Sequence, residues 1–232
     1  EYSYDDLQDR MLGYNRTISQ TVHIGSLFAQ NEWKNHHWSL LIGGRLDKHN
    51  LMDHVIFSPR ANLRYNPTDD VNLRLSYSSG FRAPQAFDED LHVTAVGGDV
   101  ALIQLSPNLK EEKSQSLSAS ADLYHRFGAV QANFLLEGFY TDLRDVFLLE
   151  EIGRDAAGNL LLERRNGKGA SVMGINLEGK IAYAWLQLQA GATLQRSRYK
   201  EPEQWSDNPN VVPQKKMFRS PDCYGYFTAT LT

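Results

Sequence analysis

The chain lacks any long hydrophobic run. No segment approaches the roughly 18 to 20 consecutive apolar residues that form a membrane-spanning helix, and the mean hydropathy is −0.47. Hydropathy therefore excludes helical membrane spans. It does not exclude a transmembrane barrel, because the strands of such a barrel are apolar on one side only and average out as polar.

Cysteine, excess charge and catalytic motifs are also scarce. Cys223 is the only cysteine, which excludes a disulfide framework within the chain. The formal net charge of −4 provides no basic field for nucleic acid. The sequence holds no G-x-S-x-G, H-E-x-x-H, G-x-x-x-x-G-K-[ST] or C-x-x-C motif. We therefore expect no enzymatic activity, no resident cofactor and no nucleic-acid partner.

Alternating polarity is what the sequence has in abundance. Its clearest stretch, residues 57–77, holds two runs in which apolar and polar residues alternate, joined by a polar turn at residues 66–70. Arg60, Arg64 and Arg74 all fall on the polar side. Side chains of a strand alternate between its faces with period two, so the stretch predicts an antiparallel hairpin with one apolar face and one wet face. A face that carries three arginines needs water.

The same alternation recurs along the chain. It predicts further strands over residues 17–33, 38–47, 114–124, 129–149, 171–184, 186–198 and 222–232. Residues 1–16, 85–113, 150–170 and 199–220 show no sustained period and are expected to be loops, with a hairpin within the third segment. No useful helix signal and no domain linker is present. The sequence therefore predicts one all-β unit over residues 1–232, with about nine or ten strands.

Short and long connections alternate between these strands. A soluble sandwich has no reason to place all its short turns at one end, whereas an outer-membrane barrel has short periplasmic turns and long extracellular loops. Aromatic residues lie beside the short turns, as an interfacial girdle would; alternatively, aromatics simply favour strand ends. They are Trp33, Trp38, Tyr65, Tyr124, Phe127, Tyr183 and Trp185. Together these patterns predict part of an antiparallel up-and-down transmembrane β-barrel.

Four motifs carry a resemblance to a known family. NLRLSYSSGFRAP (residues 72–84) resembles the strand of TonB-dependent outer-membrane receptors that enters a large extracellular loop through Phe81, Arg82, Ala83 and Pro84. SPNLKEE (residues 106–112), with Pro107, Asn108 and Leu109, resembles the family's NPxLKPE box, although a serine replaces its first asparagine. NGKGASVMGINLE (residues 166–178) resembles a later strand, although Asn176 and Leu177 stand where the family often has Val-Glu. Arg219-Ser220-Pro221 resembles a late strand opener. The four matches follow the family order and cover the chain from about Thr17 onward.

The resemblance implies a barrel of about 22 strands with a plug in its lumen, of which this chain resembles the C-terminal portion. We expect no plug within residues 1–232 and expect the missing strands to come from residues outside this chain or from a second chain. Arg60, Arg64 and Arg74 would face the aqueous lumen. The implied location is the bacterial outer membrane. The implied partners are membrane lipid, the TonB energy-transducing complex, acting through the plug, and a small-molecule cargo.

The cargo expected from the resemblance is a scarce solute, most of all an iron chelate such as a siderophore or haem, with cobalamin or a glycan as alternatives. In haem-uptake members a histidine between the Phe-Arg-Ala-Pro element and the NPxL box binds the iron axially. His92 occupies that place, and imidazole suits iron. For other cargo, the loop aromatics Phe87, Tyr199 and Trp205 are candidates by position.

Two other functions fit a barrel. One is a passive porin or structural barrel, which a plug domain in the full gene would exclude. The other is an outer-membrane hydrolase. It would need a serine and a histidine together on an outward strand face, and the predicted outward faces bring no such pair together.

Overall fold

The computed structural model describes residues 1–232 except 86–93, 97–98, 205–207, 209, 219 and 232. Strands dominate these residues, and the single helical element among them is a 3-10 turn, η1 (Leu12–Tyr14). The strands are β1 (Tyr2–Met11), β2 (Arg16–Lys34), β3 (Trp38–His49), β4 (Val55–Thr68), β5 (Val71–Arg82), β6 (Thr94–Val96), β7 (Asp99–Leu105), β8 (Glu112–Phe127), β9 (Val130–Arg144), β10 (Phe147–Arg154), β11 (Leu160–Asn166), β12 (Ala170–Tyr183), β13 (Leu186–Glu203), β14 (Gln214–Lys216) and β15 (Cys223–Leu231).

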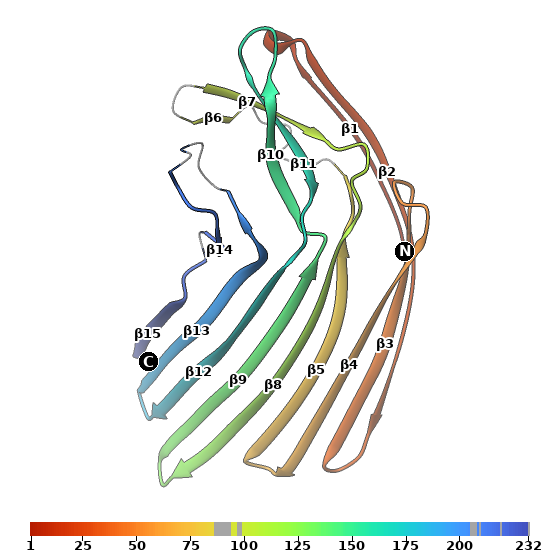
Figure 1. Ribbon diagram of the computed structural model, residues 1–232. Helices are drawn as coiled ribbons and strands as arrows, with labels where there is room; N and C mark the ends of the chain where they lie inside the picture. Colours follow the sequence, from red (N-terminus) through yellow and green to blue (C-terminus); the bar gives the residue numbers. More distant parts are fainter. Residues whose placement is uncertain (86–93, 97–98, 205–207, 209, 219, 232) are drawn as a thin grey trace.

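Eleven of these strands form one antiparallel sheet that curves as an open arc (Figure 1). Its order is β1-β2-β3-β4-β5-β8-β9-β12-β13, after which β14 and β15 both pair with β13. Neighbours in the sheet are therefore sequence neighbours, except where the chain leaves to build a second sheet. That sheet, in the order β10-β11-β7-β6, lies beyond one end of the arc, and its β7 and β11 pair in parallel. The all-β antiparallel fold expected from the sequence is confirmed, and the barrel is not closed within this chain.

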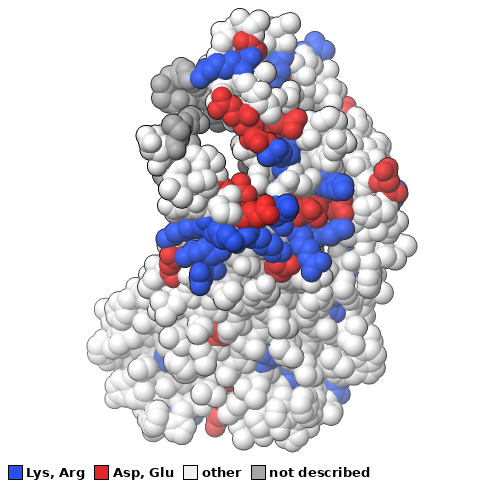
Figure 2. All heavy atoms as spheres, in the orientation of Figure 1, with Lys and Arg blue, Asp and Glu red and all other residues white. Residues whose placement is uncertain are grey.

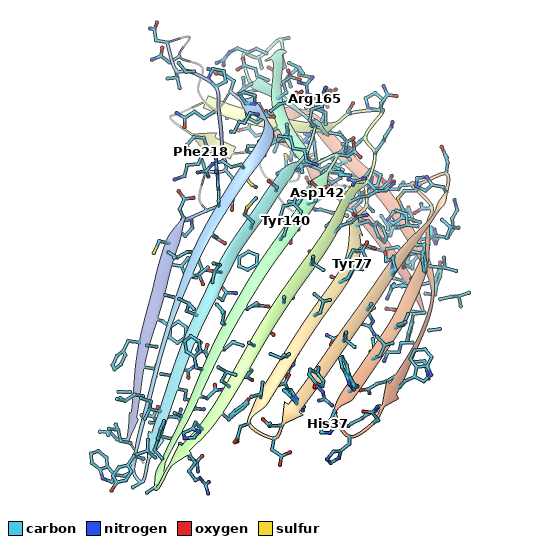
Figure 3. All side chains as sticks on the ribbon, turned by 60° about the horizontal axis from the view of Figure 1, so that its bottom comes forward. His37, Tyr77, Tyr140, Asp142, Arg165 and Phe218 are labelled. Atoms are coloured by element: carbon cyan, nitrogen blue, oxygen red, sulfur yellow. The ribbon has the colours of Figure 1, made fainter. Side chains whose placement is uncertain are left out.

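The short connections β2–β3, β4–β5, β8–β9 and β12–β13 all lie at the same end of the arc, at the bottom of Figure 1. The longer connections, including the whole second sheet, lie at the opposite end. Figure 3 places His37 at the short-turn end and Arg165 beyond the other. Gly128, in the β8–β9 turn, has a φ of 61°, a conformation that side chains with a Cβ rarely adopt. From β2 onward the structure thus shows the alternation of short and long connections that the sequence predicts, whereas the short β1–β2 connection lies at the opposite end.

The main sheet has an apolar face and a polar face, which the strand register defines. One row across the apolar face consists of Leu40, Leu63, Leu75, Ala119, Gly138, Ile175 and Leu194. The adjacent row on the polar face consists of Ser39, Arg64, Arg74, Ser120, Glu137, Asn176 and Thr193. Leu75, Ile175 and Leu194 are each about half exposed. Figure 2 shows the lower part of this apolar face with few charged side chains.

Aromatic residues flank the short-turn end of the apolar face. Trp38 stacks on Tyr65 with ring centroids 4.1 Å apart. Phe127 and Tyr183 lie on the same face, since Phe127 pairs with Val130 and Val130 with Tyr183. Tyr124 differs: its hydroxyl donates to Asp122 at 2.7 Å on the polar face. The girdle interpretation therefore fits these outward aromatics but not Tyr124.

Several predicted loops contain strands, and one predicted strand is two. Residues 85–113 hold β6 and β7, and residues 199–220 hold the end of β13 and all of β14. Residues 1–16 contain β1, which pairs with β2 from Tyr2 to Met11. The predicted strand 129–149 is two strands, because the backbone at Asp145 adopts a left-handed conformation with φ 53° and the chain turns from β9 into β10. It returns through Gly169, with φ 115°, where a Cβ would lie 2.2 Å from the Leu143 carbonyl oxygen. Only glycine fits there.

Buried apolar side chains gather where the two sheets meet. Among the described residues they include Met52, Ala83, Ile103, Val146, Phe147 and Ala170. Their strands and connections all reach the long-loop end of the arc. The conventional core of this chain therefore lies at that junction, and the sheet itself has no packed layer on either face within the part of the chain that the structure describes.

Candidate functional site

The polar face forms a concavity of about 460 Å³ around the three arginines. Arg60, Arg64 and Arg74 all line it, so the structure brings together the residues that the sequence placed on one wet face. Asn62 donates to the Ser76 hydroxyl at 2.9 Å across β4 and β5, and Arg60 donates to the Gln30 side chain. Ser39 donates to Glu32 at the same concavity.

Arg64 and Arg74 are direct cross-strand partners. Like charges placed opposite each other repel. The Nε atom of Arg64 is buried and has no hydrogen-bond partner among the described residues. Two adjacent guanidinium groups with spare donors suit an anion, because the planar fork of arginine matches a carboxylate or a phosphate. This part of the polar face therefore suits a negatively charged group, although the Glu32 carboxylate also lines the concavity.

A second cluster, the rim junction, lies at the long-loop end and is centred on Glu111. The Glu111 carboxylate is 3.0 Å from His54 Nε2 and 2.8 Å from Lys113 Nζ, and its side chain is only 7% exposed. Burial raises the pKa of Glu111, but the hydrogen bond from Lys113, a backbone hydrogen bond and the nearby Lys113 and His54 outweigh it. The pKa of Glu111 therefore lies below its usual range, and the carboxylate is held ionised.

Glu112 extends the rim junction into the second sheet. It accepts a hydrogen bond of 2.6 Å from the Phe147 backbone N–H and lies 3.7 Å from Arg82. The Arg82 guanidinium lies over the Phe147 ring, 5.5 Å from its centroid. The motif residue Arg82 thus joins the end of β5 to the start of β8 and to β10.

Asn166 connects the remaining motif to the rim junction. Its side chain accepts from the Lys110 N–H at 2.7 Å and donates to the carbonyl oxygens of Lys110 and Asp145, at 2.9 and 2.7 Å. Three motifs that are distant in the sequence therefore meet in space, at the point where the second sheet leaves the arc. None of these roles follows from the motif matches alone, although Asn166, Glu111 and Glu112 are all motif residues.

His49 fixes the loop beside this cluster. It is fully buried. Its Nδ1 accepts from the Leu51 N–H at 3.1 Å, so its Nε2 carries the proton and donates to Gln85 at 3.1 Å. The bond ties the end of β3 to the chain directly after the motif residues Ala83 and Pro84, which are both buried. The motif residues Phe81, Pro107, Asn108 and Leu109 lie at or beside the ends of β5 and β7, in the same region.

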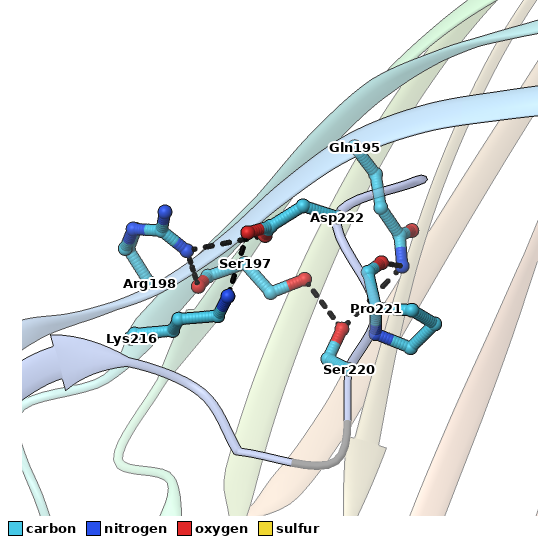
Figure 4. A network of polar contacts seen from close by, with 7 residues as sticks. All are labelled: Gln195, Ser197, Arg198, Lys216, Ser220, Pro221 and Asp222. Carbon is cyan, nitrogen blue, oxygen red and sulfur yellow. Dashed lines mark hydrogen bonds and ion pairs between the residues drawn. The ribbon is translucent and has the colours of Figure 1, made fainter. Parts of the chain in front are cut away.

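The predicted cargo residues are only partly described. Tyr199 lies on β13, opposite Ala170 of β12. His92, Phe87 and Trp205 lie outside the described residues, as does Arg219 of the late motif. The remaining residues of that motif contact β13. Gln195 donates to the Pro221 carbonyl at 2.9 Å, and the Ser197 and Ser220 hydroxyls are 3.0 Å apart (Figure 4).

Among the described residues no group of three or more histidine, cysteine, aspartate or glutamate side chains forms a metal site. No helix among them is long and apolar enough to cross a membrane.

Comparison with known proteins identifies the class. The family model for the β-barrel of TonB-dependent receptor-like proteins matches residues 1–222. The chain therefore belongs to the TonB-dependent receptor family, whose members are outer-membrane transporters and not enzymes.

Solved structures agree on the fold. The ferric enterobactin receptor PfeA of Pseudomonas aeruginosa is 20% identical with a TM-score of 0.60, over 78% of this chain and 27% of that protein. The siderophore receptor PirA of Acinetobacter baumannii is 17% identical with a TM-score of 0.60, over 79% and 29%. The FrpB iron transporter of Neisseria meningitidis is 16% identical with a TM-score of 0.60, over 90% and 33%. The chain thus spans about a third or less of these proteins. No curated protein matches.

Proposed function

We propose that this chain is part of the barrel wall and outer loops of a TonB-dependent outer-membrane receptor that actively imports an iron chelate. The observation that carries the proposal is the two-faced sheet: one face suits hydrocarbon, and the other carries Arg60, Arg64 and Arg74 in a polar concavity. In a soluble protein this large apolar face would be exposed to water, which soluble monomeric proteins rarely allow. A barrel wall places it against lipid and places the arginines against a water-filled lumen.

The remainder of the barrel and the plug belong to residues outside this chain. The outer edge of β1 has no partner strand among the described residues, and an unpaired strand edge is not tolerated in hydrocarbon. A plug in the lumen would meet the Arg64 and Arg74 guanidinium groups, and an energised inner-membrane complex would act on that plug. This step distinguishes an active importer from a passive porin.

We favour a ferric siderophore as the cargo, because the similar structures are described as a ferric enterobactin receptor, a siderophore receptor and an iron transporter. The rim junction supports a cargo site in the loops, since it ties the second sheet to the main sheet through Arg82, Glu112 and Asn166. Tyr199 lies on the strand that leads into these loops, and Phe87 and Trp205 are further candidates from the sequence.

Growth tests the cargo directly. A strain that lacks the gene is grown on single sources of ferric siderophore, haem, cobalamin or glycan, with the intact gene as the complementing control. We expect growth to fail only on an iron source and to depend on the TonB system. Failure on haem alone, reproduced by His92→Ala, would assign haem and make His92 its ligand. Unchanged growth on both iron sources, or growth that is independent of TonB, would overturn the proposal.

A further inference from the structure

A groove runs over the apolar face of β8, β9, β12 and β13. It measures about 740 Å³ and is lined by Leu117, Ala119, Tyr140, Met173, Ile175 and Leu194, with Arg196 and Asp222 at one end. The hollow exists because Ala119 and Gly138 are small where their row neighbours are large. A Cβ added at Gly138 would meet nothing within 4 Å. The groove therefore occupies the space that larger side chains at residues 119 and 138 would fill, and its walls are apolar along most of its length.

Cations gather directly above this groove. Arg196, Arg198 and Lys200 lie at alternate positions of β13, and Lys113 pairs with Arg144 across β8 and β9. Figure 2 shows the resulting belt of lysine and arginine side chains above the region with few charges. In Figure 3, Asp142 of this belt lies next to Tyr140 of the groove, on β9.

The belt has fewer carboxylates than cations. Asp142 lies 2.6 Å from Lys200 and 3.0 Å from Arg144. Asp222 lies 2.7 Å from Lys216 and 3.5 Å from Arg198 (Figure 4). Each carboxylate thus serves two cations. Arg196 has no ion pair within the described part of the chain, and its side chain lies at the end of the groove.

We propose that this groove and belt bind one phosphorylated lipid, with an acyl chain along the groove and a phosphate at Arg196. An arginine fork binds a phosphate through paired hydrogen bonds, and cations beside an apolar surface attract anionic lipid. A lipid explains both halves of the site, because the groove continues into the apolar face while the charges lie only at its outer end. The inference rests on the proposed placement of this face in the outer membrane.

Two depressions on the same face provide a matched comparison. The lower one, about 530 Å³, is lined by Leu123, Phe134, Ile181 and Phe227 and lies toward the short turns, away from the belt. A Cβ added at its Gly179 would meet nothing within 4 Å, as at Gly138. Gly138→Leu and Gly179→Leu therefore fill equivalent hollows with the same side chain. Arg126, near the β8–β9 turn and on the polar face of β8, supplies an arginine control that lies away from the groove.

The test uses the full-length receptor, purified in detergent, and measures binding of a diphosphorylated, acylated lipid A and of its dephosphorylated form. We expect the intact protein to bind the phosphorylated form about tenfold more tightly. Arg196→Gln should remove that preference, and Gly138→Leu should weaken binding of both forms. Gly179→Leu and Arg126→Gln should bind as the intact protein does. Inorganic phosphate at millimolar concentration should not compete.

Equal binding by Arg196→Gln and Arg126→Gln, or by the two glycine variants, would overturn the proposal, as would competition by inorganic phosphate alone. Membrane fractionation and growth on the iron source are measured in parallel. If the protein fractionates to the outer membrane and supports growth but shows no lipid preference, only the lipid site fails. If it binds the lipid but supports no iron-dependent growth, only the proposed cargo fails.

Discussion

The environment of Glu111 differs from that of an ordinary surface carboxylate. It is buried, yet it is held ionised by Lys113 and by its position next to His54. Removal of one partner of a buried charge pair is costly, because the other charge then stays uncompensated. The sequence match to the NPxLKPE box identified the position but not this role, since His54 comes from a loop 57 residues earlier.

We expect Glu111→Gln to loosen the rim junction by about 1 to 3 kcal/mol at neutral pH. Because the folded-state pKa of Glu111 is lowered, its contribution is present above the ordinary glutamate pKa of about 4.3 and is lost as the pH falls through the lowered value. Hydrogen exchange of residues 106–113 should therefore differ between variant and intact protein at pH 7 and converge in acid. The exposed Glu151→Gln is the control. A difference that persists unchanged in acid would contradict this role.

At the scale of elements, the junction between the two sheets depends on Asn166. Its three hydrogen bonds join the end of β11 to the connections before β8 and after β9. Two of its partners are backbone carbonyl oxygens. Loss of the amide would leave these bonds and the bond from the Lys110 N–H unmade, which costs free energy at a junction between two sheets.

Asn166→Ala should raise the hydrogen exchange of β10 and β11, equivalent to a loss of about 1 to 3 kcal/mol, while β8 and β9 stay protected. Asn159→Ala is the matched control, because Asn159 lies in the turn between the same two strands and its side chain binds Asp155 there. It should affect the tip of the hairpin alone. Equal exchange across β10 and β11 in the two variants would show that the junction does not depend on Asn166.

Strands with alternating polarity could be predicted from the sequence, and strands without it could not. The hairpin β4–β5 was predictable because each strand has one apolar and one wet face, so polarity alternates with period two. β1 has no such signal, because it pairs with residues 16–25 of β2, beyond the apolar part of the sheet, and carries charges on both sides. The boundary between β9 and β10 has none either, because the turn at Asp145 involves neither glycine nor proline. The period-two alternation of polarity is present in the sequence only where one face of a strand is apolar and the other faces water.

At the scale of the whole molecule, the open arc corresponds to part of the wall of a β-barrel. The apolar face, the outward aromatics and the short-turn end follow from patterns that repeat along most strands of the main sheet, and the sequence predicted them. The rim junction could not be predicted, because it joins residues from the β3–β4, β7–β8 and β9–β10 connections, whose meeting depends on the path of the second sheet. The groove could not be predicted from the sequence either, since it depends on Ala119 and Gly138 being cross-strand neighbours.

The most direct test of the account compares the two faces of one strand. Spin labels are placed at Leu75 and at Ser76, one at a time, in full-length receptor reconstituted in lipid, after Cys223 and any cysteine outside this chain have been replaced by serine. Leu75 belongs to the apolar row and Ser76 lines the arginine concavity. We predict that the label at residue 75 is relaxed mainly by oxygen dissolved in the bilayer and the label at residue 76 mainly by a water-soluble nickel complex. The reverse result, or equal accessibility at both positions, would contradict the assignment of this chain as a barrel wall.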